Sequence, residues 1–545
     1  MKTSYLLLAV LLGSLPTYAG DAALLNIVQR VTKQEAAFVS QLRTRTPVLE
    51  TYIQEAPAGT EVKTNTRVAK DHYFLGRLHL AGDIEYTPIV ARSDLAKSGL
   101  SKSSRLMFFR SHSMLFAPEG FAQMIFIDAQ AGFSPETYSF EYAGREFLGD
   151  VRALILDVTP RDPTSPGRFI GRIWVEDTTY QVVRFNGNYT HSTAAHMFFH
   201  FDSWRVCVAP DLWVPAVIYV EETAGAKKTS APFSFKAQTR LWGYNTGAAL
   251  RSDELARILV EMETPVKDGE SGADASPLES QRAWEHQSEQ NVLDRLEKSG
   301  LLSPKGAVDQ VLDTVINNLS VSNGLTMEAH GRVLLTTPIE TFTVGHTILI
   351  SRGLLDVLPD ESSLAMVLSD ELAHIALGHK TNTQFAFRSM TMFSDEDLME
   401  RFRFARSPQE IAEAGKRAVE FLSKSPYAAK MGNAGLFLRA LSSRAPRFPN
   451  LIRPNIGNGL ANGETILRMA DLLARAPSLE EDKLEQIAAL PLGSRVKLDP
   501  WTCETSLVKT KPVELLAARE KLLFEITPFT LFLTRTEGRP KASGE

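Results

Sequence analysis

The sequence has very few cysteines: Cys207 and Cys503 are the only two among 545 residues. At most one disulfide can therefore form. We assign the two cysteines to different domains, and a lone cysteine in a folded domain is usually simply buried. The sequence thus favours two free thiols and leaves a Cys207–Cys503 bridge open for an oxidising compartment.

Long apolar runs and blocks of one charge are also missing. No stretch beyond the N-terminus reaches the roughly 18 to 20 apolar residues that a membrane span requires, so we do not expect the chain to cross a membrane. The formal net charge is -5 and no Lys/Arg block stands out, which excludes nucleic acid and an anionic membrane surface as partners. With 44% hydrophobic and 23% charged residues, the composition is that of an ordinary globular protein.

The N-terminus has the form of a secretory signal. Lys2 precedes the apolar run Tyr5–Leu12, and Thr17-Tyr18-Ala19 stands before Gly20 as a cleavage site. We therefore expect residues 1–19 to be removed and the protein to be secreted or periplasmic. No cysteine lies near the cleavage point, which argues against a lipid anchor.

The chain is too long for one core, and about 150 residues per domain predicts three or four units. The pattern divides into a signal peptide, a β-rich domain, a linker with a helix, a mainly helical domain and an appendage, at residues 1–19, 20–250, 251–285, 286–474 and 475–545. The polar, Gly- and Pro-containing stretch Glu263–Pro277 is the expected linker, and each flanking domain is expected to fold on its own core. The appendage contains the strand-like segment Leu522–Leu533.

The β-rich domain begins with an expected helix over Asp21–Leu42, whose apolar residues recur about every 3.6 positions. Five β-branched and aromatic segments then predict one large antiparallel sheet to about Asn245: Thr46–Gln54, Gln123–Asp128, Gly167–Glu176, Tyr180–Phe185 and Leu212–Glu221. The run Phe169–Arg184 resembles the curved half-barrel of the LolA-type, outer-membrane lipoprotein-sorting fold. That resemblance implies a lipid or lipoprotein groove lined by Phe169, Trp174, Phe185, Phe198 and Trp204, with ordinary core packing as the alternative.

A group of histidines lies in the same region. His196, His200 and Asp202 share one face if this segment is a strand, and His191 is nearby, so a metal site is one interpretation. Half-exposed strand histidines are the other.

The mainly helical domain is predicted from its periodicity. Helices are expected over Ser276–Leu302, Val308–Leu319 and Glu361–Lys380, with strand-like segments at Gly331–Thr337 and Phe342–Ser351. The last helix contains SDELAHIALGH, Ser369–His379, which matches the zinc-protease pattern H-E-x-x-H except at its first position.

In that pattern two histidines four residues apart bind zinc from one helical face, and the glutamate is the general base. Here Asp370 stands at the first histidine position, while Glu371 and His374 are present. Asp370 and His374 differ by only about 40° around a helix, so both could still reach one metal ion.

With the preceding strand and the Gly-Leu-Leu that begins at Gly353, this stretch resembles metallopeptidase family 48, a group of zincins that includes the CAAX prenyl proteases. The resemblance implies a third zinc ligand at Glu413, fourteen residues before Tyr427. A rival register would use Tyr427 and Ala429 instead. The resemblance also implies substrate binding at five positions: Thr343, Val344, Gly345 and His346 of the edge strand, and Arg453, which stands where the family has a later histidine.

The departures from the family pattern lie at the positions that would bind the metal ion or support its ligands. Asp370 replaces a ligand histidine and Gly415 replaces the aspartate of the family's E-A-D motif. A set of Asp370, His374 and Glu413 carries one more negative charge than two histidines and a glutamate, so we expect zinc to be bound weakly or not at all. If a metal is held, Glu371 is the residue that would deprotonate the bound water.

The sequence therefore predicts a multidomain α+β protein, with an N-terminal antiparallel β half-barrel-like domain and a mainly helical zincin-like metallopeptidase domain. Our functional hypothesis is a pseudopeptidase that binds a protein or peptide client in the old cleft, as a chaperone or scaffold at the cell envelope. Two alternatives remain: an active zinc metalloendopeptidase with Asp/His/Glu ligation, and a lipid or lipoprotein carrier.

Overall fold

The computed structural model describes most of the chain, with several gaps. The described residues are 17–57, 70–89, 108–110, 113–128, 132–190, 200–210, 212–222, 233–245, 277–380, 404–480, 492–509 and 524–536. Most of the signal peptide, all but the last residue of the linker Glu263–Pro277, and the histidines at 191 and 196 lie outside them. In the part of the chain that is described, no helix is long and apolar enough to cross a membrane.

A ten-stranded antiparallel sheet forms the N-terminal part, in the order β3-β2-β1-β12-β11-β10-β9-β8-β7-β6. Its strands are β1 (Val48–Pro57), β2 (Lys70–His79), β3 (Glu85–Pro88), β6 (Tyr138–Leu148), β7 (Val151–Pro160), β8 (Phe169–Glu176), β9 (Val182–Tyr189), β10 (His200–Ala209), β11 (Leu212–Glu222) and β12 (Phe233–Trp242). The sheet is not closed into a barrel, because β3 and β6 are separate edges. The single large antiparallel sheet expected from the sequence is confirmed.

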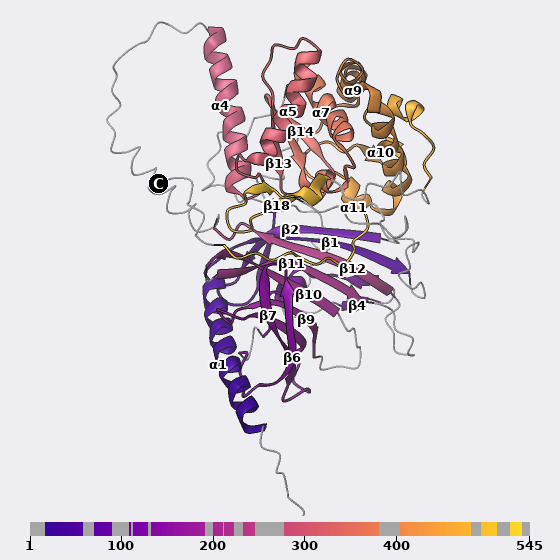
Figure 1. The fold of residues 1–545 in the computed structure, drawn as a ribbon. Coiled ribbons are helices and arrows are strands. Elements are labelled where there is room, and N and C mark those ends of the chain that lie inside the picture. Colours follow the sequence, from indigo (N-terminus) through magenta and orange to yellow (C-terminus); the bar gives the residue numbers. More distant parts are fainter. Residues whose placement is uncertain are drawn as a thin grey trace, which may run out of the picture.

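One face of this sheet is covered by the helix α1 (Thr17–Leu42), drawn in indigo in Figure 1. Successive side chains of a strand point to opposite faces, so Leu49 and Ile53 pack on this face with Val31 and Phe38 of α1. The short helix α2 (Pro118–Gln123) belongs to the same layer. The strand predicted over Gln123–Asp128 is wrong: the segment ends α2 and turns, and its short apolar run is buried without entering the sheet.

The opposite face supports the mainly helical region (Figure 1). Its larger elements are α4 (Pro277–Lys298), α5 (Ala307–Ser322), β13 (His330–Leu334), β14 (Thr341–Val344), β15 (Thr347–Ser351), α6 (Arg352–Val357), α7 (Glu361–Ala376), α9 (Pro408–Ser423), α10 (Met431–Arg444) and α11 (Pro449–Ile452). The strands form a small sheet in the order β13-β15-β14, which leaves β14 as the edge nearest to α7.

Smaller elements complete the described chain. They are β4 (Phe108–Arg110), β5 (Ser113–Leu115), the 3-10 turns η1 (Ala428–Lys430), η2 (Ala445–Arg447), η3 (Ala470–Arg475) and η5 (Leu492–Arg495), and the strands β16 (Ala461–Asn462), β17 (Thr465–Ile466), β18 (Val496–Leu498) and β19 (Thr505–Leu507).

The sheet and the helical region share one hydrophobic cluster. Tyr52, Tyr73 and Trp242 of the sheet belong to the same buried cluster as the residues of α5 and α7. Two buried carboxylates reinforce this contact. Glu50 accepts hydrogen bonds from the backbone N–H and hydroxyl of Thr337, at 2.6 and 2.7 Å. Asp71 accepts from the backbone N–H groups at the start of α11. The boundary at residues 251–285 stays a prediction, and this shared core gives a reason to expect that the two regions unfold together.

The C-terminal segment 524–536 returns to the sheet. Leu533 packs with Trp204 and Trp213 on the face opposite α1, and Arg535 pairs with Glu176. The strand predicted over Leu522–Leu533 is wrong for the described residues of that segment, which form only an isolated bridge between Gly149 and Leu533. Cys207 and Cys503 are both free thiols.

Candidate functional site

The helix α7 carries the degenerate motif and is buried almost all round. Its N-terminus is capped by Asp360, whose carboxylate accepts a hydrogen bond from the backbone N–H of Ser363 at 2.8 Å. Every residue from Ser362 to His374 is buried. Because the helix is packed on all sides, its polar residues at 370, 371 and 374 must find partners inside the protein.

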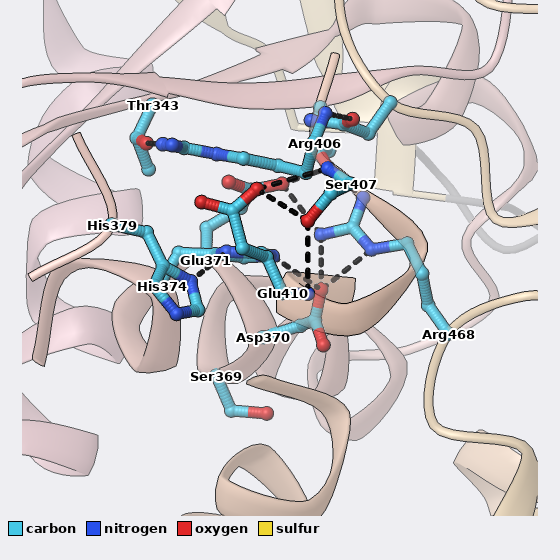
Figure 2. Close-up of polar contacts among 12 residues, drawn as sticks. Thr343, Ser369, Asp370, Glu371, His374, His379, Arg406, Ser407, Glu410 and Arg468 are labelled. Atoms are coloured by element: carbon cyan, nitrogen blue, oxygen red, sulfur yellow. Dashed lines mark hydrogen bonds and ion pairs between the residues drawn. The ribbon is translucent and has the colours of Figure 1, made fainter. Parts of the chain in front are cut away.

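Those partners centre on Arg468, from the segment just before η3 (Figure 2). Its Nε donates to Asp370 Oδ2 at 2.5 Å, and its Nη2 lies 2.5 Å from Glu371 Oε1. Its Nη1 donates to the hydroxyl of Thr341 on β14 at 2.6 Å, and that hydroxyl donates to Glu371 Oε1 at 2.6 Å. Asp370, Glu371, Arg468 and Thr341 each have 0% of their surface exposed. We call these four residues the Arg468 cluster.

Two carboxylates share one guanidinium in this cluster, so their charges are not fully balanced. Burial raises the pKa of Asp370 to about 6, and the neighbouring Glu371 adds to the rise while Arg468 opposes it. Burial also acts to raise the pKa of Glu371, but Arg468, His374 and the Thr341 hydroxyl outweigh it and hold that pKa below its ordinary value. Glu371 is therefore the carboxylate that the cluster keeps ionised.

His374 lies at the border of the cluster. Its Nε2 is 3.9 Å from Asp370 Oδ2, and its Nδ1 is 2.8 Å from Nδ1 of His379, which lies just beyond the end of α7. Burial is the main cause that lowers the pKa of His374 to about 4. The imidazole is therefore neutral near pH 7.

Glu413, the third ligand implied by the family resemblance, lies outside the cluster. Its side chain on α9 is 53% exposed, and its carboxylate is 3.8 Å from His379 Nε2. It also accepts a hydrogen bond from Gln409 at 3.2 Å. Tyr427, which supported the register, donates to Glu361 at the other end of α7. Over the described residues, no group of three or more His, Cys, Asp and Glu side chains is placed to hold a metal ion.

Gly415, by contrast, faces the cluster from α9. A Cβ at this position would lie 3.2 Å from the backbone nitrogen of Met469 and 3.9 Å from Asp370 Oδ1. A side chain here would thus press on the backbone next to Arg468. The absence of one gives the segment that carries Arg468 room to approach α7.

The predicted substrate strand is a tight hairpin. β14 ends at Val344, and Gly345 and His346 form the turn into β15. Gly345 has φ 56°, in the left-handed region that favours glycine. The continuous strand predicted over Phe342–Ser351 is therefore wrong at the turn.

The outer edge of β14 is covered by the chain itself. Thr341 and Asn458 exchange two backbone hydrogen bonds, at 3.1 and 2.8 Å. Phe404 stacks on Phe342 with ring centroids 4.8 Å apart, and Arg406 donates to the Thr343 hydroxyl at 2.7 Å. Thr343 is only 1% exposed as a result. An added peptide strand would first have to displace these segments.

The remaining predicted residues lie elsewhere. Arg453 is exposed at the end of α11, and the arginine in the cluster is Arg468, which we did not predict from the sequence. The signal was present, because Arg468 is a single charge within the apolar run Ile466–Ala470. In the β-rich part, Asp202 pairs with Arg184, at 2.8 and 2.9 Å, and His191 and His196 of the predicted group lie outside the described residues.

The predicted groove aromatics do not share one surface. Phe169 and Phe185 are buried on the α1 face, whereas Trp174 and Trp204 are buried on the opposite face. Phe198 lies outside the described residues. Ordinary core packing therefore accounts for the four that are described.

Comparison with known proteins identifies the helical region. Residues 307–420 match the model of Peptidase family M48, so the resemblance drawn from the motif is confirmed for this region. No curated protein matches the chain.

Several solved structures are similar to parts of the chain. A putative outer membrane lipoprotein-sorting protein domain from Vibrio parahaemolyticus has 11% identity and a TM-score of 0.22, over 44% of this chain and 97% of that one. A DUF1329 family protein from Desulfovibrio piger has 14% identity and a TM-score of 0.21, over 39% of this chain and 90% of that one. The MucA/MucB complex structure from Pseudomonas aeruginosa has 11% identity and a TM-score of 0.13, over 39% and 93%.

The zinc ion that the M48 family implies does not fit these residues. A zinc ligand set needs unpaired donor atoms that converge on one point. Asp370 and Glu371 instead each contact the Arg468 guanidinium, and Glu413 is exposed beside His379. The carboxylate oxygens without a hydrogen bond, Asp370 Oδ1 and Glu371 Oε2, are buried next to a cation that is already in place.

Proposed function

We propose that the M48-type region of this chain no longer cleaves peptides and acts instead as a binding or scaffolding module at the cell envelope. The observation that carries this proposal is that the Glu371 carboxylate is buried and already hydrogen-bonded within the protein. A general base must lie within hydrogen-bond reach of a water molecule and of the substrate. Glu371 has no exposed surface, and its Oε1 is held by Thr341 and Arg468.

The covered edge of β14 supports the same conclusion. Binding of a peptide as an added strand, the mode that the edge strand suggests, requires free backbone groups along that edge. Here Asn458 pairs with Thr341, and the segment from Phe404 to Arg406 lies over Phe342 and Thr343. A protein or peptide partner would therefore bind to another surface of the molecule rather than in the old cleft.

The packing of the sheet argues against the lipid-carrier alternative for the α1 face. A carrier needs an apolar groove that its own chain leaves open. On this face α1 is anchored by the buried ion pair between Glu35 and Arg205, and Phe38 stacks against the same arginine.

Export to the envelope is part of the proposal. Among the described side chains of α1, the first buried one is that of Val28, which lies after the expected cleavage site at Ala19. Mass spectrometry of the mature chain, expressed with its native N-terminus in a bacterium, should give Gly20 as the first residue. A mature chain that keeps residues 1–19 would contradict export by a cleaved signal.

Metal analysis and a proteolysis assay test the loss of catalysis. The purified chain should contain well under one equivalent of zinc and should show no chelator-sensitive cleavage of casein. The Glu371→Gln variant is the matched control, because any cleavage that it retains comes from a contaminant. Stoichiometric zinc, together with casein cleavage that Glu371→Gln abolishes, would overturn the proposal.

A further inference from the structure

The Arg468 guanidinium contacts the residues of the motif on the side where a metal ion would bind. In H-E-x-x-H, the metal sits beside the first and last residues of the motif, and the glutamate faces it. In this chain, Asp370 and Glu371 both contact the guanidinium, and the imidazole of His374 lies 3.9 Å from the Asp370 oxygen that Arg468 binds. A cation of the protein itself thus stands where the motif would present its side chains to a metal ion.

The residue at the first motif position suits this cation. A neutral histidine at 370 would offer the guanidinium one ring nitrogen, whereas a guanidinium has only donors and pairs best with a carboxylate. Asp370 Oδ2 accepts from Arg468 Nε at 2.5 Å and also contacts Nη2. Asp370 and Arg468 are therefore chemically matched to each other.

Space for the arginine comes from α9. Met469, the next residue after Arg468, has φ 54° and its backbone nitrogen approaches Gly415. With a Cβ at 415, that nitrogen would be 3.2 Å away, which is tighter than nine in ten contacts of a Cβ. A glycine at 415 therefore lets the backbone bring Arg468 between α7 and β14.

We infer that Asp370, Gly415 and Arg468 form one coupled replacement of the metal centre, in which the guanidinium of Arg468 occupies the position of the ion and holds α7, β14 and the segment before η3 together. This inference rests on the proposed loss of catalysis and adds its cause. It has a consequence that the motif alone does not give: restoring the missing histidine is not sufficient to restore metal binding, because the resident cation remains.

The test is a zinc chloride titration followed by calorimetry, on full-length mature chains without a polyhistidine tag. Asp370→His alone should bind zinc no better than the wild type. Asp370→His combined with Arg468→Met should lower the zinc dissociation constant at least about 10-fold relative to Asp370→His, the scale for one ligand or its support. Two imidazoles one helical turn apart are then free to bind the ion.

The matched control removes another arginine with almost no exposed surface, Arg205. Asp370→His combined with Arg205→Met also loses a buried guanidinium, but in the sheet, and should gain no zinc affinity. If the double variant with Arg468→Met is unfolded without metal, zinc should restore its helical circular dichroism signal, since metal binding is then linked to folding.

Three outcomes would overturn the inference. They are equal zinc affinity of Asp370→His with and without Arg468→Met, the same gain from Arg205→Met, and a double variant that zinc neither binds nor refolds. Each can occur while the wild type stays free of zinc and inactive on casein. The proposed function, in contrast, is decided on the wild type alone.

Discussion

Each of the two regions contains an arginine with almost no exposed surface, and the two are compensated differently. In the sheet region, Arg205 forms a two-pronged pair with Glu35 of α1, with both distances 2.7 Å. It also lies over the Phe38 ring at 3.8 Å and donates to backbone carbonyls. One guanidinium meets one carboxylate there, so the pair is neutral. In the helical region, Arg468 meets two carboxylates, and the cluster keeps one excess negative charge.

This difference in charge balance distinguishes the Arg205–Glu35 pair, which has a structural role, from the Arg468 cluster, which we infer to be a converted metal site. A neutral bidentate pair is what a core tolerates when it must bury an arginine. A second carboxylate in the same place adds a desolvation cost, which appears as the raised pKa of Asp370. Two carboxylates that face one point are what a site for a doubly charged ion would contain. Arg468 supplies only half of that charge.

Removing either arginine should have the largest effect on the stability of the protein. Arg468→Met leaves two buried carboxylates without the cation that contacts both of them, whereas Arg205→Met leaves one. Breaking a buried pair typically costs about 3 to 5 kcal/mol of unfolding free energy. We expect Arg468→Met to be at the upper end and Arg205→Met at the lower end, measured by urea unfolding at neutral pH. A greater loss for Arg205→Met would break the comparison.

Neutralising one carboxylate in each region should affect the stability of the protein very differently: strongly in the sheet region and weakly in the helical region. Glu35→Gln removes the carboxylate that pairs with Arg205 and should cost about 3 kcal/mol or more. Asp370→Asn keeps the approximate shape of the side chain, removes the excess charge, and leaves Glu371 to pair with Arg468. It should change the unfolding free energy by less than about 1 kcal/mol, since the lost charge-assisted hydrogen bond offsets the relieved desolvation. Equal losses for the two variants would show that the charge count does not matter.

The contact between the regions should give an intermediate effect. Asp71 of β2 accepts from the backbone N–H groups of Asn450 and Leu451, at 3.0 to 3.1 Å. Asp71→Asn places an amide where only an acceptor fits, and should cost about 1 to 3 kcal/mol.

Because both regions share one core, thermal unfolding of the wild type should be a single transition that this variant shifts as a whole. Asp157→Asn, at an exposed ion pair with Arg172, is the control and should have little effect. Two separate transitions, with only one shifted, would restore the independent domains expected from the sequence.

The sequence was informative where its pattern was periodic and local. The alternation of apolar residues predicted the large sheet, and the 3.6-residue period predicted α5 and α7, because each pattern reports which face of a segment is buried. The motif also placed Asp370, Glu371 and His374 correctly on one buried helix. Gln123–Asp128 was mistaken for a strand because a short apolar run does not distinguish a strand from a buried turn.

The converted site could not be found in the same way. Arg468 is 98 residues from Asp370 in the chain and 97 from Glu371, and nothing in the local pattern connects them. The cover over β14 comes from Phe404, Arg406 and Asn458, which also lie far from it in sequence. A degenerate motif predicts that a metal ligand was lost. What replaced it depends on tertiary contacts, which the motif does not encode.

The cap of α7 provides the smallest and most specific prediction. Asp360 accepts from the N–H and hydroxyl of Ser363 and from Asn433, and its pKa is lowered because these hydrogen bonds outweigh the effect of burial. Asp360→Ala should cost about 1 kcal/mol of unfolding free energy near neutral pH, the usual scale for a lost N-cap.

A carboxylate with a lowered pKa in the folded state stabilises the fold at pH values above its ordinary pKa of 3.8, and this contribution is lost as the pH falls through the lower, folded-state value. The difference between wild type and Asp360→Ala in urea unfolding should therefore be constant near neutral pH and shrink below about pH 4. Asp360→Asn, which can still cap the helix but cannot ionise, should lose less at neutral pH and show no such change. If the difference between wild type and Asp360→Ala grows instead as the pH falls, the carboxylate does not stabilise α7 in its ionised form.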